Sequence, residues 1–209
     1  MTELAFSIED AGVLEHAAAP TLRFDLRIES PRDIRSVALN VEIRIAATRR
    51  AYGEAEQERL VELFGRPEDW GRNLHALHWT TLNVNVPAFS GQTVAELKVP
   101  CSYDLEVAGA RYMNAIGDGR VPLEFLFSGA VFYTGDGGRL QVGRVGWDQE
   151  VDFSLPVALW REAMERHFPG AAWLRLGRES FERLTAYKAR HTLLTWEQTV
   201  DALLSEAGE

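Results

Sequence analysis

Two histidines separated by two residues, His75 and His78, have the spacing in this chain that most resembles a metal-binding pair. On a helix, residues i and i+3 share one face, so both imidazoles could reach the same ion. This pair instead leads into Trp79 and a stretch of strand character, and an odd spacing in a strand turns side chains to opposite faces. No cysteine or carboxylate cluster accompanies them. We therefore expect no bound metal.

Cys101 is the single cysteine of the chain and the next candidate for chemistry, as a nucleophile. A catalytic cysteine requires a histidine close in space. Cys101 alternates in phase with Val99 and Leu105, which predicts a small, buried core residue, the usual fate of a free cysteine. One cysteine also permits no intramolecular disulfide, which fits a reducing compartment.

Two glycine-rich segments, 117–119 and 135–138, resemble calcium loops because each contains an aspartate. Calcium takes roughly six to eight oxygen ligands, and each loop offers one carboxylate. The apolar run between them, 121–133, would span about 40 Å as a strand, so the loops cannot pool ligands. We interpret both as turns. The sequence contains no phosphate loop, nucleophile elbow, CxxC motif or zinc spacing, and we predict no catalytic, cofactor-binding or metal-binding residue.

Strands must position most of these residues. Apolar side chains alternate over residues 95–107, and the run 121–133 is apolar on both faces, as in a central strand. We predict that these two strands, joined through 117–119, form the centre of a β-sandwich. Residues 22–29 and 37–45 also alternate and flank a predicted turn, which favours an antiparallel pair. Further strands are predicted at residues 6–8, 82–86, 140–145 and 151–155.

Helical periodicity appears in two places. Residues 54–64 combine an acidic start with apolar residues on one face, and Gly65 and Pro67 favour an end there. From Pro156 onward the helical pattern predicts about three helices, the last opened by the capping box of residues 195–198. The predicted fold class is α+β: an antiparallel β-sandwich of about 7–9 strands with one inserted helix, spanning 1–155, and a helical C-terminal segment, 156–209.

The net charge of −9 argues against a nucleic-acid or anionic-membrane surface, both of which require positive patches. No apolar run approaches the roughly 20 residues of a membrane-spanning helix. The first residues lack the basic and apolar regions of a signal peptide. We therefore expect a cytoplasmic protein with no nucleic-acid partner and no membrane span.

The C-terminal segment is the predicted site of function, because it concentrates aromatic and arginine side chains in short helices. Short helices are marginal alone and need an apolar neighbour. That neighbour is the sandwich itself, a second copy of the chain or a partner protein. Tryptophan and arginine are favoured anchors of protein interfaces. The candidate interaction residues are Trp173, Arg175, Arg178, Arg183 and Trp196.

Five segments carry a resemblance to a known family: Val99-Pro100-Cys101-Ser102-Tyr103-Asp104, Val121-Pro122-Leu123, Trp173-Leu174-Arg175-Leu176, Tyr187-Lys188 and Thr195-Trp196-Glu197. They resemble an uncharacterised bacterial domain family of unknown function, associated with [NiFe]-hydrogenase gene clusters, over nearly the whole chain. The resemblance implies an accessory or assembly partner of a hydrogenase and transfers no active-site residue. One cysteine cannot hold an iron–sulfur cluster through four thiolates, so such a role would act by contact.

Two functions follow from these observations. The first is a non-enzymatic accessory or interaction protein that docks through its helical segment or an exposed sheet edge, with a homo-oligomer as one form. The alternative is a small-molecule-binding or hydrolytic domain whose pocket is built from distant residues such as His75, Asp104 and Asp148. A deep pocket with converging polar groups would favour the alternative.

Overall fold

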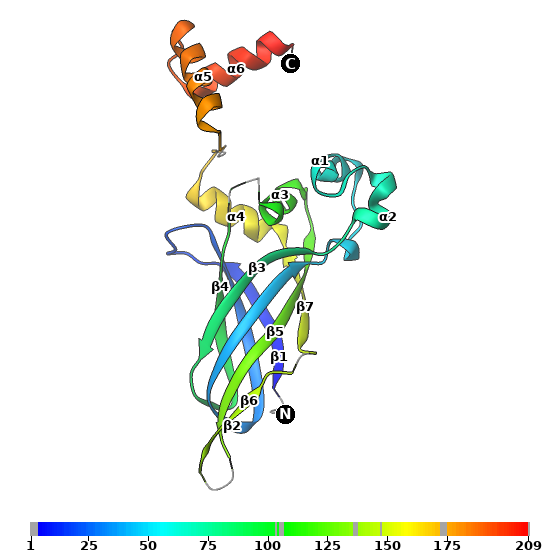
Figure 1. Ribbon diagram of the computed structural model, residues 1–209, viewed down its shortest axis with the longest axis vertical. Coiled ribbons are helices and arrows are strands. Elements are labelled where there is room, and N and C mark those ends of the chain that lie inside the picture. Colours follow the sequence, from blue (N-terminus) through cyan, green and yellow to red (C-terminus); the bar gives the residue numbers. More distant parts are fainter. Residues whose placement is uncertain are drawn as a thin grey trace. The chain divides into compact units, whose positions relative to one another are not determined.

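The computed structural model describes residues 4–102, 104, 107–135, 138–146, 148–171 and 175–208. The chain divides into two compact units, Met1–Ala172 and Trp173–Glu209. The first contains a seven-stranded antiparallel sheet with helices gathered at one end of the strands, and the second contains two helices (Figure 1). The predicted α+β class with an antiparallel, sandwich-like sheet is confirmed.

The sheet is organised around one long strand, β2 (Thr21–Ile45). Along one edge of β2 the chain runs back as β3 (Leu77–Val86) and β4 (Phe89–Pro100), with pairing that continues from Ile45 opposite Leu77 to Thr21 opposite Pro100. The N-terminal half of β2 also pairs with β1 (Ala5–Val13), and its C-terminal half with β5 (Arg120–Thr134). One strand is therefore shared by both halves of the sandwich.

The prediction of a hairpin between residues 22–29 and 37–45 is wrong. Residues 30–33 kink β2 rather than reverse it, and the pairing register shifts between Ser30 and Ile34. Pro31 lies in this gap, where its missing N–H costs no ladder hydrogen bond. Alternation alone could not distinguish a kinked strand from two strands, because both bury the same set of side chains.

Strand β5 confirms the predicted strand over 121–133, and it divides its outer edge between two partners. Its first part pairs with β7 (Glu150–Pro156) and its last part with β6 (Leu140–Arg144). Gly129 marks the exchange with a φ of 143°. A β-carbon there would lie 2.1 Å from the carbonyl oxygen of Ala38, so only glycine fits.

The predicted strand over 95–107 is partly wrong, because β4 ends at Pro100 and helix α3 (Ala108–Ala115) follows. Residues 103, 105 and 106 lie outside the described residues. Tyr112 and Met113 of α3 are fully buried. The predicted central pair is also wrong, because β4 pairs with β2 and not with β5. The chain connects β4 to β5 through α3, whose eight residues are too few to give a clear helical period.

Aromatic side chains join the two halves of the sandwich. The ring centroid of Phe24 in β2 lies 5.2 Å from that of Phe125 in β5 and 5.8 Å from that of Phe153 in β7. Phe6 in β1 stacks on Phe127 with centroids 4.4 Å apart. Such contacts add to the hydrophobic stabilisation of the core.

The predicted helix over 54–64 is confirmed as α1 (Glu54–Phe64), which buries Leu60 and Phe64. Gly65 follows it with a φ of 74°. This insertion between β2 and β3 is larger than the one helix expected, because it also contains α2 (Trp70–Asn73) and two 3₁₀ turns. The 3₁₀ turns cover Ala47–Arg49 and Pro67–Asp69.

Helix α4 (Val157–His167) is the first helix of the predicted C-terminal segment, and it contacts β1, β2 and β7. Its buried residues, Val157, Trp160, Ala163 and Met164, belong to the main core. It therefore packs on the sandwich within the first unit. The second unit holds α5 (Arg178–Arg190) and α6 (Trp196–Ala207).

Candidate interaction site

The start of α6 is determined by a local sequence signal, the capping box of residues 195–198. Thr195 caps α6: its side-chain oxygen accepts a hydrogen bond from the backbone N–H of Gln198 at 3.1 Å. The Gln198 side chain in turn accepts from the backbone N–H of Thr195 at 3.3 Å. The predicted capping box is confirmed, and it fixes where α6 starts and which side chains face α5.

Three contacts hold α5 against α6. The rings of Phe181 and Trp196 lie 5.3 Å apart, and the Lys188 ammonium lies 5.6 Å from the Trp196 ring. Lys188 also donates hydrogen bonds to the carbonyls of residues 193 and 194. The Tyr187 hydroxyl donates to Glu206 at 2.8 Å, and this carboxylate raises the pKa of Tyr187.

These contacts leave much of the unit's apolar surface uncovered. No described residue of α5 is fully buried, and in α6 only Thr199 is. Trp196, Val200 and Leu204 remain 43%, 44% and 45% exposed, and Leu194 is 83% exposed. Large exposed apolar side chains gathered on a small helical unit are typical of a protein-interaction surface.

A groove of about 470 Å³ runs along α5. Its lining combines the guanidinium-bearing side chains of Arg183 and Arg190 with apolar atoms from α5 and from Leu203 of α6. The two arginines are seven residues apart, which places them on one helix face, two turns from each other. We call this feature the α5 groove; its lining residues are Ser180, Arg183, Leu184, Ala186, Tyr187, Arg190 and Leu203.

The candidate residues named from the sequence are distributed over this unit. Arg183 lines the α5 groove, whereas Trp196 packs on Phe181 and is half-exposed. Arg178 is the first residue of α5, and Arg175 precedes the helix; both are exposed. Trp173 lies outside the described residues. Arg183 and Trp196 therefore belong to different parts of the unit's surface.

Sequence reasoning missed Arg190 and the role of Lys188. The signal for Arg190 was present, because its distance of seven residues from Arg183 repeats the helical face. Lys188 carried no comparable signal, since its cation–π contact depends on how the connection between the helices folds back.

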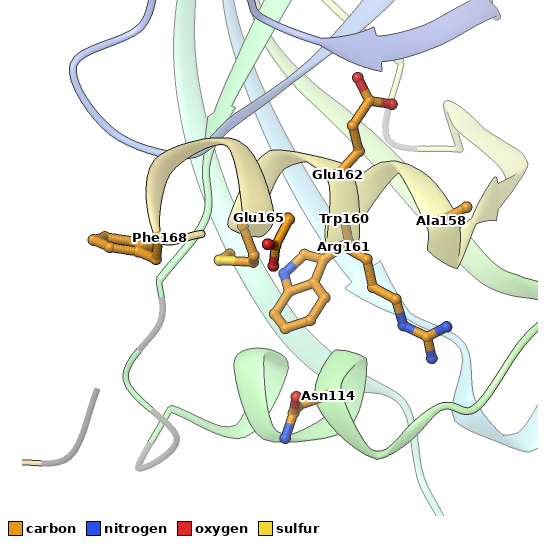
Figure 2. A pocket seen from close by; sticks show the side chains of 8 residues that line it. Asn114, Ala158, Trp160, Arg161, Glu162, Glu165 and Phe168 are labelled. Carbon is orange, nitrogen blue, oxygen red and sulfur yellow. The ribbon is translucent and has the colours of Figure 1, made fainter. Parts of the chain in front are cut away.

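A second surface feature lies in the first unit, between α3 and α4 (Figure 2). This groove has a volume of about 560 Å³ and is lined by Asn114 of α3 and by one side of α4, including Trp160, Met164 and Phe168. Its charged side chains already have internal partners. Arg161 donates to the carbonyls of residues 116 and 117, and Glu165 accepts from the N–H of residue 170.

A polar cluster fastens α1 to the chain that follows α3. The Arg50 guanidinium donates to Glu56 at 2.9 Å, and the same carboxylate oxygen accepts from the N–H of Gly117 at 2.9 Å. Burial alone would raise the pKa of Glu56, but these hydrogen bonds lower it below its usual range. The Tyr112 hydroxyl donates to Tyr52 at 2.8 Å, and burial raises the pKa of both phenols. The two neutral phenols and the one ion pair of this cluster therefore stabilise the packing of α1 beside α3.

The residues considered for chemistry lie apart from one another. The His75 ring contacts the carbonyl of residue 73, and the His78 ring contacts the Thr81 hydroxyl. Cys101 is buried, as predicted, and burial raises the pKa of its thiol to about 12. Of the alternative pocket residues, neither Asp104 nor Asp148 lines a groove described above, and His75 does not either.

Three carboxylates, those of Glu124, Glu150 and Asp152, have oxygens within 4.8 Å of one another. The Arg49 guanidinium lies among them, 2.9 Å from Glu124 and 2.5 Å from Asp152. One positive charge of the same chain thus pairs with all three carboxylates, and a cation would have to displace that guanidinium. None of the helices in the described part of the chain is long and apolar enough to cross a membrane.

Comparison with known proteins places the whole chain, residues 1–209, in one family, described as "Family of unknown function (DUF6084)". This chain belongs to that family. The membership confirms the expected uncharacterised domain. No curated protein matches the chain.

Solved structures give only distant likenesses. The CARDB domain of a Pyrococcus furiosus protein, solved with di-metal ions, is 8% identical over 74% of this chain and 92% of that chain, with a TM-score of 0.28. A late embryogenesis abundant protein is 9% identical over 74% and 71%, with a TM-score of 0.34. Beta-glucosidase 3B from Thermotoga neapolitana is 14% identical over 73% of this chain but 17% of that chain, with a TM-score of 0.26. At these scores the likenesses carry no argument about function.

Proposed function

We propose that this member of the family is a non-enzymatic interaction protein of the cytoplasm that docks through its α5–α6 unit. The single observation that supports this is the exposed apolar surface of a unit with almost no interior of its own. Association buries such a surface, and the arginines around it suit the rim of an interface. The first unit supplies a stable body that carries the docking unit.

The proposed partner class is a component of a [NiFe]-hydrogenase, which the chain would assist in assembly or function. The support for this class is the resemblance carried by Trp173–Leu176, Tyr187–Lys188 and Thr195–Glu197. Two of these segments supply contacts that hold α5 against α6, through Tyr187, Lys188 and Trp196. These segments of the family resemblance and the exposed apolar surface therefore lie in the same unit.

The small-molecule or hydrolytic alternative has no observation in its favour. The groove between α3 and α4 is lined by four apolar and four polar or charged side chains, and its three charged groups are engaged within the protein. A site for a small ligand would be expected to present converging polar groups that are free to bind it.

The test is a binding measurement between the purified full-length chain and purified hydrogenase subunits. We expect wild-type protein to bind and the variant Val200→Glu/Leu204→Glu to lose binding, because two charges then enter the apolar surface. The control is Leu140→Glu/Val142→Glu, which changes two apolar residues of β6 in the first unit that are more exposed than Val200 and Leu204. If only the control loses binding, docking occurs through the sheet edge and the proposed role of α5–α6 fails.

A further inference from the structure

The unit formed by residues 173–209 is too small to be stabilised by its own interior. It spans 37 residues, and units below about 40 residues usually need a disulfide, a metal or oligomerisation. The chain's one cysteine, Cys101, lies outside it. Two packed helices bury one side of each helix at most, so the remaining apolar surface requires a further helix or sheet.

The two helices carry opposite charge. Helix α5 has four basic and two acidic side chains, a net charge of +2, whereas α6 has three acidic side chains and no basic one. The basic side chains of α5 include Arg183 and Arg190 beside the apolar floor of the α5 groove. A groove of this kind fits an acidic amphipathic helix.

Helix α6 is itself such a helix. Trp196, Val200 and Leu204 recur every fourth residue and form one exposed apolar stripe. Glu197 and Asp201 each follow a member of the stripe, so both carboxylates lie along one edge of it. Among the described residues, Arg183, Arg190, Glu197 and Asp201 form no ion pair. The chain therefore presents both an acidic apolar helix and a basic apolar groove.

We infer that the α5–α6 unit pairs with the same unit of a second copy of this chain. The α6 stripe of each copy enters the α5 groove of the other, with Glu197 and Asp201 facing Arg183 and Arg190. The contact is isologous, so both copies bury both surfaces at once, and the product is an assembly of four helices. This inference rests on the proposed docking role of α5–α6: the second copy covers the surface until a hydrogenase component displaces it.

The test exchanges the charges on the full-length chain. One variant carries Arg183→Glu and Arg190→Glu, and a second carries Glu197→Arg and Asp201→Arg. All four residues are exposed, so the substitutions leave buried contacts intact. Glu182→Arg is the control, because Glu182 is an exposed residue of α5 that does not line the groove. The mass in solution is measured by analytical ultracentrifugation over a concentration series, and circular dichroism checks the fold of each variant.

We expect the wild type and the control to be dimers. Each charge-exchange variant alone should dimerise about 100-fold more weakly, since like charges then face each other at both contacts. An equimolar mixture of the two variants should recover the dimer, because both contacts become complementary again. A structural defect in either variant would not be repaired by mixing, so recovery is specific to the proposed contact.

A wild type that is monomeric at every concentration would overturn the inference. A dimer that both variants retain would also overturn it, because another surface would then be responsible. In either case the proposed function stands if the wild type binds hydrogenase subunits and Val200→Glu/Leu204→Glu does not. If neither self-association nor that binding is observed, both proposals fail.

Discussion

Gly129 of β5 lies so close to Ala38 of β2 that a β-carbon on the glycine would be 2.1 Å from the alanine carbonyl oxygen. This close approach occurs where β5 changes partner from β7 to β6. At the same point the N–H of Val145 donates a hydrogen bond to the Gly129 carbonyl at 3.1 Å. The backbone of Gly129 also has a positive φ of 143°. Both steric space and backbone conformation therefore require glycine at this point.

Gly129→Ala is expected to lower the free energy of unfolding by about 3 kcal/mol, because the added methyl group must displace the β2 backbone. Urea denaturation followed by circular dichroism measures the change. Gly71→Ala is the matched control, since a β-carbon at Gly71 meets no atom within 4 Å and alanine favours helix α2. Equal stability of the two variants would contradict the close approach.

Cys101 is expected to resist labelling by a thiol reagent in the folded protein, because the residue is only 6% exposed and burial raises the pKa of its thiol to about 12. Labelling should become fast only in denaturant, and the measurement is the ratio of the two rates. Cys101→Ala should lower the free energy of unfolding by about 1–2 kcal/mol through a small cavity. Rapid labelling of native protein would show that the thiol is accessible.

The same thiol predicts a pH effect of known sign. The unfolded chain loses the Cys101 proton near the ordinary pKa of 9, whereas the folded chain keeps it up to about pH 12. Above pH 9 the unfolded state therefore gains stability relative to the folded state, and the free energy of unfolding falls as the pH rises. Cys101→Ala removes this contribution and leaves those of the other groups. The stability advantage of the wild type over the variant should thus shrink above pH 9 and change sign before pH 12.

Much of this fold could be predicted from residue patterns that act locally. The capping box at Thr195 gave the start of α6, and the alternation over 121–133 gave the central strand β5. What failed depended on distant partners. Residues 22–45 form one kinked strand because β1, β4, β3 and β5 pair along it, and no local pattern records which partner a segment meets.

The candidate site divides in the same way. Trp196 and Arg183 were recognised from residue type, since both types favour interfaces. The α5 groove could not be predicted, because it exists only where Leu203 of α6 packs beside Leu184 and Tyr187 of α5. The solvent exposure of the apolar stripe could not be predicted either. A stripe such as Trp196, Val200 and Leu204 has the same sequence pattern whether it is buried or open to solvent.

Glu56→Gln is expected to lower the free energy of unfolding at neutral pH by about 2 kcal/mol, because it leaves Arg50 without its ion-pair partner in a site where both side chains are mostly buried. The pKa of Glu56 is lowered in the folded state, so its contribution is present above the ordinary pKa of 4.5 and is lost as the pH falls through the folded-state value. The wild type and Glu56→Gln should therefore converge in acid.

Glu162→Gln is the control for Glu56→Gln, since its ion pair with Arg166 is solvent-exposed and is expected to contribute less than about 0.5 kcal/mol. Denaturation curves at a series of pH values measure all three proteins. A constant difference between wild type and Glu56→Gln from neutral pH down to strong acid would contradict the proposed ion pair, and so would an equal effect of the two substitutions.

Removal of residues 173–209 is expected to leave the first unit folded. Among the residues that the structure describes, every buried side chain of the main hydrophobic core lies between Leu4 and Met164, and α4 contributes Trp160 and Met164 to it. The sheet ladders likewise end at Pro156. The shortened chain should therefore show the same cooperative unfolding transition by circular dichroism, within about 1 kcal/mol of the full-length protein, because no described side chain after Met164 belongs to that core. At the same time it should lose binding to hydrogenase subunits, since α5 and α6 are gone. Aggregation or unfolding of the shortened chain without any partner present would mean that residues 173–209 are part of the core, and the docking role proposed for α5–α6 would then be wrong.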